Sequence, residues 1–208
     1  MPNPSPSHPL VLGVLGGVAA GKSTVAAFLA GEKGRILSAD AIAREVLEST
    51  EGCAALVERY GPGALDEQGI PDRVALAARI FGEPVERTWL ESWTHPRVRA
   101  RILADLDQAR RAGVPRVVLD VPLLMENDPQ HHLMAECDHL VFVEVSDAER
   151  DRRAVASRGW EPGEVARREA AQLPLDTKRS RADFVIAGEV SLTELAHAID
   201  AILRELGH

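Results

Sequence analysis

The strongest constraint on the fold is a short apolar run that leads directly into a glycine-rich loop and then into a helical stretch. The run, Leu10 to Leu15, is broken only by Gly13, which is the pattern of a strand buried on both faces of a parallel sheet. The loop that follows reads GGVAAGKS from Gly16 to Ser23 and matches G-x-x-x-x-G-K-[ST]. Residues 22–30 have a helical composition. A strand, this loop and a helix in that order predict a phosphate-binding P-loop.

Each part of the loop has a chemical role toward a nucleotide. Glycines let backbone N–H groups turn inward around phosphate oxygens, and the helix N-terminus adds partial positive charge. Lys22 would reach the terminal phosphates, and the Ser23 hydroxyl would ligate Mg²⁺. The alternative is a glycine turn with a chance lysine, which the flanking strand and helix disfavour. We therefore expect ATP and Mg²⁺ as cofactors, with the nucleotide held by Gly16, Gly17, Val18, Ala19, Ala20, Gly21, Lys22, Ser23 and Thr24.

The rest of the chain alternates between strand and helix patterns. Apolar or β-branched runs predict four more strands, at residues 35–37, 114–120, 139–145 and 183–186. Such alternation predicts a parallel α/β sheet with right-handed crossovers, and ligands of such sheets sit beyond the carboxyl ends of the strands. The expected fold is a single P-loop NTPase-type domain over residues 10–208, a three-layer α/β/α structure with a five-stranded parallel sheet. Residues 1–9 are expected to form a disordered tail.

A mostly helical region is expected at about residues 50–112, where it would bind the substrate. Helix starts are predicted at Pro71-Asp72 and at His95-Pro96, because proline fits the first turn of a helix. Two further helix starts have the spacing of a capping box, in which a hydroxyl and a carboxylate satisfy reciprocal N–H groups. These pairs are Ser146 with Glu149 and Ser191 with Glu194.

A cationic stretch suggests a lid at about residues 150–180. Its basic side chains suggest a small anionic ligand in an otherwise acidic chain, and those before Gly159 would fold over the ATP phosphates and exclude water. Most arginines of a charged helix lie in solvent or in weak exposed ion pairs, so one or two are expected to bind phosphate. The basic residues are Arg150, Arg152, Arg153, Arg158, Arg167, Arg168, Lys178, Arg179 and Arg181.

Composition and short motifs exclude several other classes of protein. The formal net charge of the 208 residues is -8, which argues against nucleic-acid binding. Cys53 and Cys137 have neither metal-binding nor disulfide spacing and fit a reducing compartment. We expect a cytoplasmic protein without a membrane segment. The TKRS segment at residues 177–180 lacks the aspartate of the guanine-reading [NT]-K-x-D, which disfavours a GTPase switch.

Three acidic residues and one histidine are candidates for contacts with substrate or metal. Asp40 follows the second strand and could be the general base for an attacking hydroxyl, or the N-cap of the next helix. Asp120 ends a strand where P-loop proteins place an acid that reaches Mg²⁺, or it is a cap or turn carboxylate. Glu126 either bonds to the acceptor or is solvated, and His95 either contacts substrate or is structural.

With these residues in place, the sequence resembles the dephospho-CoA kinases from Val11 to about Leu203. The segments GVLGGVAAGKSTV, SADAIAREV, THPRVR, DVPLLMEN and AAQLPLDTKRSRADFVI occur in that family's order and approximate spacing. The DVPLL and HP segments distinguish this family from other P-loop kinases. The resemblance implies transfer of the γ-phosphoryl group of ATP to the 3'-hydroxyl of the ribose of dephospho-CoA. This is the final step of coenzyme A biosynthesis, and no obligate protein partner is expected.

The resemblance also implies roles for single residues. Asp40 would be the base, Arg44 would bind the acceptor or orient that base, and the P-loop and the lid arginines would hold the phosphates. The implied catalytic residues are Asp40, Lys22 and Arg153, and the implied metal ligands are Ser23 and Asp120. ATP would be bound by Arg153 and Arg158 in addition to the P-loop. The substrate would be bound by Asp40, Arg44, His95, Leu124 and Glu126.

Three departures from the family pattern leave alternatives open. Ser38 replaces the first aspartate of an Asp-x-Asp segment, Arg153 and Arg158 stand one residue further apart than usual, and Ala187-Gly188 replaces a polar Asp-Asn that could contact adenine. The competing hypotheses are another small-molecule kinase, a P-loop protein that uses ATP as a switch, and a family member that binds nucleotide without transferring phosphate.

Overall fold

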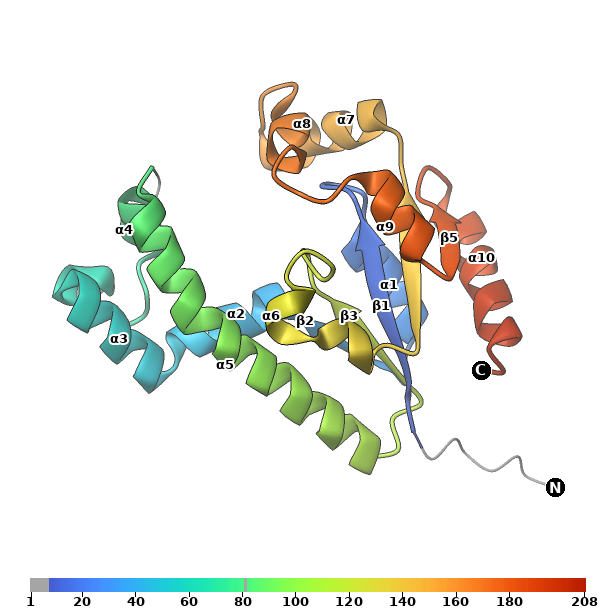
Figure 1. Cartoon of the computed structure of the whole chain (residues 1–208), viewed down its shortest axis with the longest axis horizontal. Helices are drawn as coiled ribbons and strands as arrows, with labels where there is room; N and C mark the ends of the chain where they lie inside the picture. The colour runs from blue at the N-terminus through green and yellow to red at the C-terminus, as the bar shows by residue number, and fades with distance from the viewer. Residues whose placement is uncertain (1–7, 81) are drawn as a thin grey trace. The chain divides into compact units, whose positions relative to one another are not determined.

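The computed structural model describes residues 8–80 and 82–208 (Figure 1). The chain forms two compact units. The first unit comprises the chain up to Ser38 together with Leu106–His208, and the second is the inserted segment Ala39–Asp105. The helical region expected at about 50–112 overlaps mainly with this second unit. Residues 1–7 of the expected tail lie outside the described residues, whereas Pro9 is buried directly before the first strand.

Five parallel strands form the sheet of the first unit, which confirms the predicted sheet. They are β1 (Leu10–Gly16), β2 (Arg35–Ser38), β3 (Arg116–Asp120), β4 (His139–Glu144) and β5 (Phe184–Ala187), in the spatial order β2-β3-β1-β4-β5. All seven residues of β1 are buried, because β3 and β4 pair with its two edges and helices cover both faces of the sheet. Ser38 at the end of β2 pairs with Asp120 at the end of β3, so these carboxyl ends meet at one edge of the sheet.

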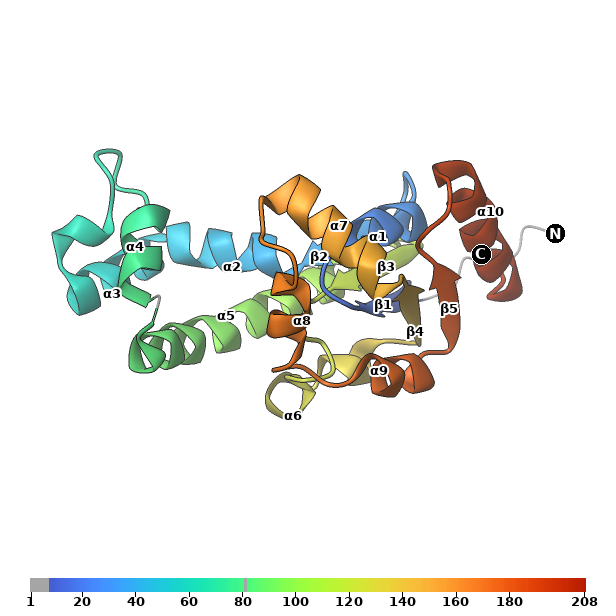
Figure 2. The same ribbon diagram turned by 90° about the horizontal axis from the view of Figure 1, so that it is seen from above.

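Helices on both faces of this sheet complete the three predicted layers. Figure 2 shows α1 (Lys22–Ala30) above the strands and α9 (Leu175–Arg181) below them. The main core includes Leu12 and Val14 of β1, and Leu29 of α1, all of which have 0% exposure. The remaining helices of the unit are α6 (Asp128–His131), α7 (Asp147–Arg158), α8 (Glu164–Glu169) and α10 (Leu192–Glu205), with a 3-10 turn at Leu133–Glu136.

The two predicted capping boxes have different outcomes. At the start of α10, the Ser191 hydroxyl accepts from the Glu194 N–H and the Glu194 carboxylate accepts from the Ser191 N–H, which confirms the box. At the start of α7, Ser146 accepts from the Glu149 N–H at 3.4 Å, but the Ser146 N–H donates to Glu189 instead. The second box is therefore wrong as a reciprocal motif, because two arginines of α7 bind the Glu149 carboxylate.

The described residues of the second unit, 39–80 and 82–105, lie mainly in four helices. They are α2 (Ala39–Glu48), α3 (Thr50–Tyr60), α4 (Arg73–Ile80) and α5 (Pro84–Arg111), the last of which continues past Asp105, with a 3-10 turn at Pro62–Ala64. Leu56, Ala64 and Leu76 form a small apolar core. The Asp72 carboxylate accepts from the N–H groups of Val74 and Ala75 at 2.9 and 3.0 Å, so the predicted helix start at Pro71-Asp72 is confirmed.

The helix start predicted at His95-Pro96 is wrong, because α5 runs through both residues. Proline has no N–H to donate to the carbonyl four residues earlier, and its ring crowds that carbonyl. The Arg97 guanidinium donates to the Trp93 carbonyl at 2.9 Å, while Thr94 and Val98 are buried. The hydrogen bond of Arg97 and the burial of the residues on either side of His95-Pro96 thus outweigh the local signal of the proline.

In the described part of the chain, no helix combines the length and apolar character needed to cross a membrane.

Candidate active site

The P-loop joins the carboxyl end of β1 to the N-terminus of α1, as predicted. Gly21 has φ 87° and Ala19 has φ 58°, and this left-handed conformation costs a residue with a side chain about 1 kcal/mol. Helix α1 has no acidic residue in its first turn and no side-chain cap. Its first N–H groups and the positive end of its dipole are therefore available to an anion.

Lys22 begins α1 and folds back over the loop. Its ammonium group donates to the carbonyls of Gly17 and Gly16 at 2.8 and 3.2 Å. Burial, and to a smaller extent the positive charge of Lys178, lowers the pKa of Lys22 to about 8 despite the opposing effect of Asp120 and Glu169. A phosphate group placed here would favour the charged form of Lys22 and replace its carbonyl partners.

Ser23 and Asp120, the two predicted metal-binding residues, lie side by side. The Ser23 hydroxyl donates to Asp120 Oδ2 at 2.7 Å, and Asp120 is only 9% exposed. A hydroxyl and a carboxylate are oxygen donors that suit Mg²⁺, which usually binds one or two protein groups together with substrate phosphates. Among residues 8–80 and 82–208, no group of three or more His, Cys, Asp or Glu side chains could hold a metal ion. A Mg²⁺ site that is completed by substrate phosphates does not need such a group.

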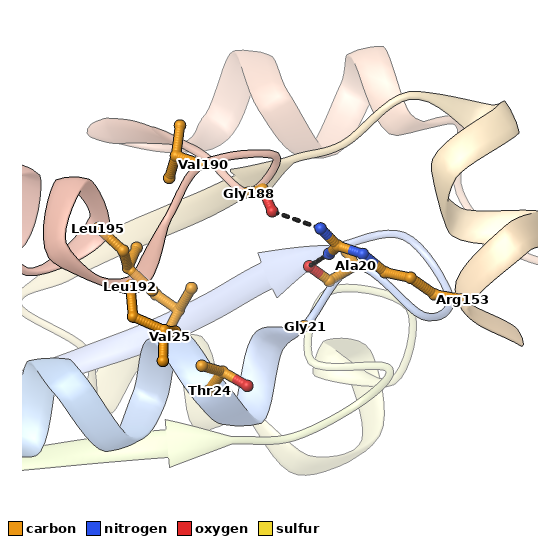
Figure 3. Close-up of a pocket in the computed structure, with 9 residues that line it drawn as sticks. All are labelled: Ala20, Gly21, Thr24, Val25, Arg153, Gly188, Val190, Leu192 and Leu195. Atoms are coloured by element: carbon orange, nitrogen blue, oxygen red, sulfur yellow. Dashed lines mark hydrogen bonds between the residues drawn. The ribbon is translucent and has the colours of Figure 1, made fainter. Parts of the chain in front are cut away.

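Arg153 connects the P-loop to the segment after β5. Its guanidinium donates to the carbonyls of Gly188 and Ala20 at 2.7 and 3.3 Å, while its Nε donates to Glu149. Together with Arg152, Arg153 lowers the pKa of the Glu149 carboxyl to about 2. Figure 3 shows Arg153 at one end of a cavity beside the start of α1. The cavity holds about 300 Å³ and is lined by Ala20, Gly21, Thr24, Val25, Arg153, Gly188, Val190, Leu192 and Leu195.

Arg150 and Glu169 meet the P-loop from α7 and α8. The Arg150 side chain, which is 2% exposed, forms an ion pair with Glu169 and another with Asp147 at 2.6 Å. Burial lowers the pKa of Arg150, but the bonds to the two carboxylates outweigh burial and raise that pKa above its usual value. Glu169 was not among the predicted site residues, since its sequence neighbours suggest only an exposed charged helix.

Lys178 and Glu126 form a second buried ion pair beside the loop. Their charged atoms are 2.6 Å apart, and their side chains are 2% and 14% exposed. Lys178 also donates to Gln172 at 3.0 Å, and Glu126 accepts from the Leu173 N–H. The suggestion that Glu126 is solvated is therefore wrong. Lys178 was predicted only as one of several lid cations, because no local pattern marks a lysine that will be buried.

Other predicted residues differ in their surroundings. Arg158 at the end of α7 is exposed, and its guanidinium lies 4.8 Å from the centre of the Trp160 ring. Leu124 is 1% exposed, and its side chain faces Gly13 of β1, which favours a packing role over the predicted substrate contact.

The predicted substrate residues of the second unit are exposed. Asp40 lies in the first turn of α2, which begins at Ala39, so the suggestion that Asp40 is the N-cap is wrong. A carboxylate in a first turn is favoured by the helix dipole. Arg44 is exposed one turn further on, and His95 is exposed in the interior of α5.

Comparisons with known proteins agree with this arrangement. The family model described as dephospho-CoA kinase matches residues 10–194. A dephospho-CoA kinase of Deinococcus radiodurans is 39% identical over 202 residues, which cover 97% of this chain and 95% of the relative. A dephospho-CoA kinase of Corynebacterium efficiens is 37% identical, with coverage of 95% and 97%. A crystal structure from Thermus thermophilus has a TM-score of 0.74 and 35% identity, and covers 96% of this chain and 98% of its own. The chain therefore belongs to the dephospho-CoA kinase family.

Proposed function

We propose that this protein phosphorylates the 3'-hydroxyl of the ribose of dephospho-CoA with ATP, giving CoA and ADP in the final step of coenzyme A biosynthesis. The observation that carries the proposal is the P-loop cradle, with Ser23 bonded to Asp120 at 2.7 Å, in a chain matched by the dephospho-CoA kinase family model over residues 10–194. We further propose a cytoplasmic location and the lack of an obligate protein partner.

The phosphates of ATP would lie in the P-loop and its base in the neighbouring cavity. The uncapped start of α1 supplies N–H donors for phosphate oxygens, and Lys22 supplies a positive charge. Apart from Thr24 and Arg153, the cavity beside the loop is lined by glycine and apolar residues, which suits the flat face of a purine. Arg153 stands at the junction, where it would bind phosphate oxygens.

Ser23 and Asp120 would hold Mg²⁺ together with the phosphates. The ion would supply charge neutralisation on the phosphoryl group being transferred. The hydroxyl oxygen of Ser23 and the carboxylate of Asp120 would be the protein ligands of the ion. The Asp120 carboxylate would give the site negative charge that favours a cation.

Asp40 is the proposed general base. Only Ala39 stands between it and Ser38, whose strand partner is Asp120. Its carboxylate would accept the proton of the ribose hydroxyl while the hydroxyl oxygen forms a bond to the γ-phosphorus. The bond from that phosphorus to the bridging oxygen of ADP breaks in the same displacement, and Lys22 and Arg153 stabilise the negative charge that develops. Arg44, on the same helix as Asp40, would bind the acceptor or orient the base.

The proposal is tested by measuring ADP release from Mg-ATP with a panel of acceptors. The panel contains dephospho-CoA, adenosine, gluconate, shikimate and water, and the product is identified by mass. Turnover with dephospho-CoA alone, lost in Lys22→Ala, supports the proposal. Turnover with a different acceptor would indicate another small-molecule kinase. Slow hydrolysis without any acceptor turnover would indicate a nucleotide switch or a family member without transferase activity.

A further inference from the structure

Glu169 places a carboxylate directly on the P-loop. Its Oε1 accepts a hydrogen bond from the Val18 N–H at 2.7 Å, across 151 positions of the sequence. The same oxygen accepts from the guanidinium of Arg150. The binding of phosphate by the P-loop does not account for these two bonds. Glu169 lies outside the loop, and contact with a nucleotide does not require a carboxylate beside Val18.

Arg150 completes the contact from α7. Its Nη1, which binds Glu169, also lies 3.5 Å from the Val18 carbonyl, and its Nε donates to the Val145 carbonyl at 3.3 Å. The N–H and the C=O of Val18 are thus both directed at one ion pair. A Cβ atom added at Gly17 would lie 2.5 Å from Arg150 Nη1 and 2.6 Å from Glu169 Oε1. The pair is therefore in direct contact with the backbone of two consecutive loop residues.

The burial of the pair distinguishes it from the many surface ion pairs of the chain. The Arg150 and Glu169 side chains are 2% and 17% exposed, and buried charges of this kind hold their geometry because every bond is needed to offset lost hydration. The loop next to them contains Ala19 in a left-handed conformation. A strained, glycine-rich loop keeps its shape only where its surroundings fix it.

We infer that Arg150 and Glu169 are positioning residues that hold the Val18 peptide and thereby set the P-loop for nucleotide phosphate. The pair ties the loop to α7 and α8, so the Arg150 and Glu169 side chains contribute to nucleotide affinity without themselves contacting the nucleotide. Loss of the pair leaves the loop free to adopt other conformations, and binding must then order it at a cost in affinity. The inference deepens the proposed function and relies on the P-loop as the nucleotide site.

The inference is tested by measuring the dissociation constants of ATP and of dephospho-CoA with Glu169→Gln and with the double variant Arg150→Met/Glu169→Met. The double variant removes both charges together, so that no unpaired charge is left buried. The matched control is Glu164→Gln, because Glu164 lies on α8, has 18% side-chain exposure and pairs with Arg167 and Arg168 without a bond to the loop. Melting temperature is recorded for every variant.

We expect the double variant to bind ATP about tenfold more weakly, as for the loss of one charge-assisted hydrogen bond. Binding of dephospho-CoA and the Glu164→Gln control should not change. The Val18 amide proton, observed by NMR without nucleotide, should shift in Glu169→Gln because its acceptor loses its charge. Unchanged ATP affinity in a folded double variant would overturn the inference. So would tighter ATP binding, which would make Glu169 a competitor of phosphate, or equal losses for both ligands, which would indicate a purely structural role.

These measurements are independent of turnover. If the wild-type protein bound ATP but did not phosphorylate dephospho-CoA, the proposed function would fail, while the comparison of ATP affinities among the variants would still decide the role of Arg150 and Glu169.

Discussion

Raising the pH from about 7 to about 9 should weaken the binding of metal-free ADP about tenfold, because the nucleotide needs a charged Lys22. Burial and the nearby Lys178 lower the pKa of Lys22 to about 8 in the free protein. A bound phosphate favours the charged form, so the pKa of Lys22 is higher in the complex. Binding then takes up a proton wherever the pH lies between these two pKa values.

The magnitude follows from the fraction of free protein that carries the charge. With a pKa of about 8, roughly nine-tenths of the Lys22 side chains are charged at about pH 7 and roughly one-tenth at about pH 9, whereas an ordinary lysine with pKa of about 10.4 stays charged throughout. The apparent dissociation constant is inversely proportional to that fraction, and the ratio gives about tenfold. Lys22 gives folding stability the opposite pH dependence, an increase as the pH rises. Its lowered pKa costs stability at neutral pH, and this cost is relieved as the pH rises from about 8 toward the unfolded value.

Isothermal titration calorimetry with ADP and a chelator measures both the affinity and the proton uptake. Titrations in buffers of different ionisation enthalpy should show uptake of a substantial fraction of a proton near pH 8. The control is Lys22→Arg, whose guanidinium stays charged over this range, so its affinity for ADP should be nearly independent of pH. A flat profile in the wild-type protein, or an equal slope in Lys22→Arg, would refute the assignment of the titrating group.

Three further predictions concern other parts of the chain. Asp120→Asn should lower kcat about 10²-fold and raise the Mg²⁺ concentration needed for half-maximal rate; an unchanged Mg²⁺ titration would show that Asp120 does not act on the metal. Cys137, whose pKa burial raises to about 12, should resist alkylation by iodoacetamide at about pH 8.5 in the native protein and react after unfolding, and mass spectrometry of the peptide would reveal native labelling if this is wrong. Pro96→Ala should restore an N–H in the middle of α5 and raise the free energy of unfolding by about 1 to 3 kcal/mol; a lower midpoint in urea would mean that the proline is needed for the native shape of the helix.

The sequence was sufficient to predict the structure wherever a pattern depends only on neighbouring residues. The buried run Leu10–Leu15, the glycines that follow it and the strand that ends at Asp120 each carry a pattern that their own neighbours determine. Parallel strands place their carboxyl ends at one edge, and the contact between Ser23 and Asp120 follows from that rule. The prediction failed at His95-Pro96 for the opposite reason, since buried neighbours carry α5 through a residue that locally favours a helix start.

Pairs of distant residues account for most of what the sequence did not predict. Glu169 accepts from an N–H that is 151 residues away, and Glu126 pairs with Lys178 from another element. A charged residue in a short helix carries no local mark of burial, because its environment depends on which segment folds over it. The capping box at Ser146 failed for a local reason instead, because Arg152 and Arg153 on the same helix occupy the carboxylate that would have completed it.

The most direct test of the central claim is a single-turnover experiment with excess enzyme and ATP labelled in its γ-phosphoryl group. The wild-type protein should move the label to the ribose 3'-oxygen of dephospho-CoA. Asp40→Asn should do so at least about 10²-fold more slowly, since it lacks a base, while binding ATP with unchanged affinity. Label released as inorganic phosphate, or transfer by Asp40→Asn at the wild-type rate, would contradict the account.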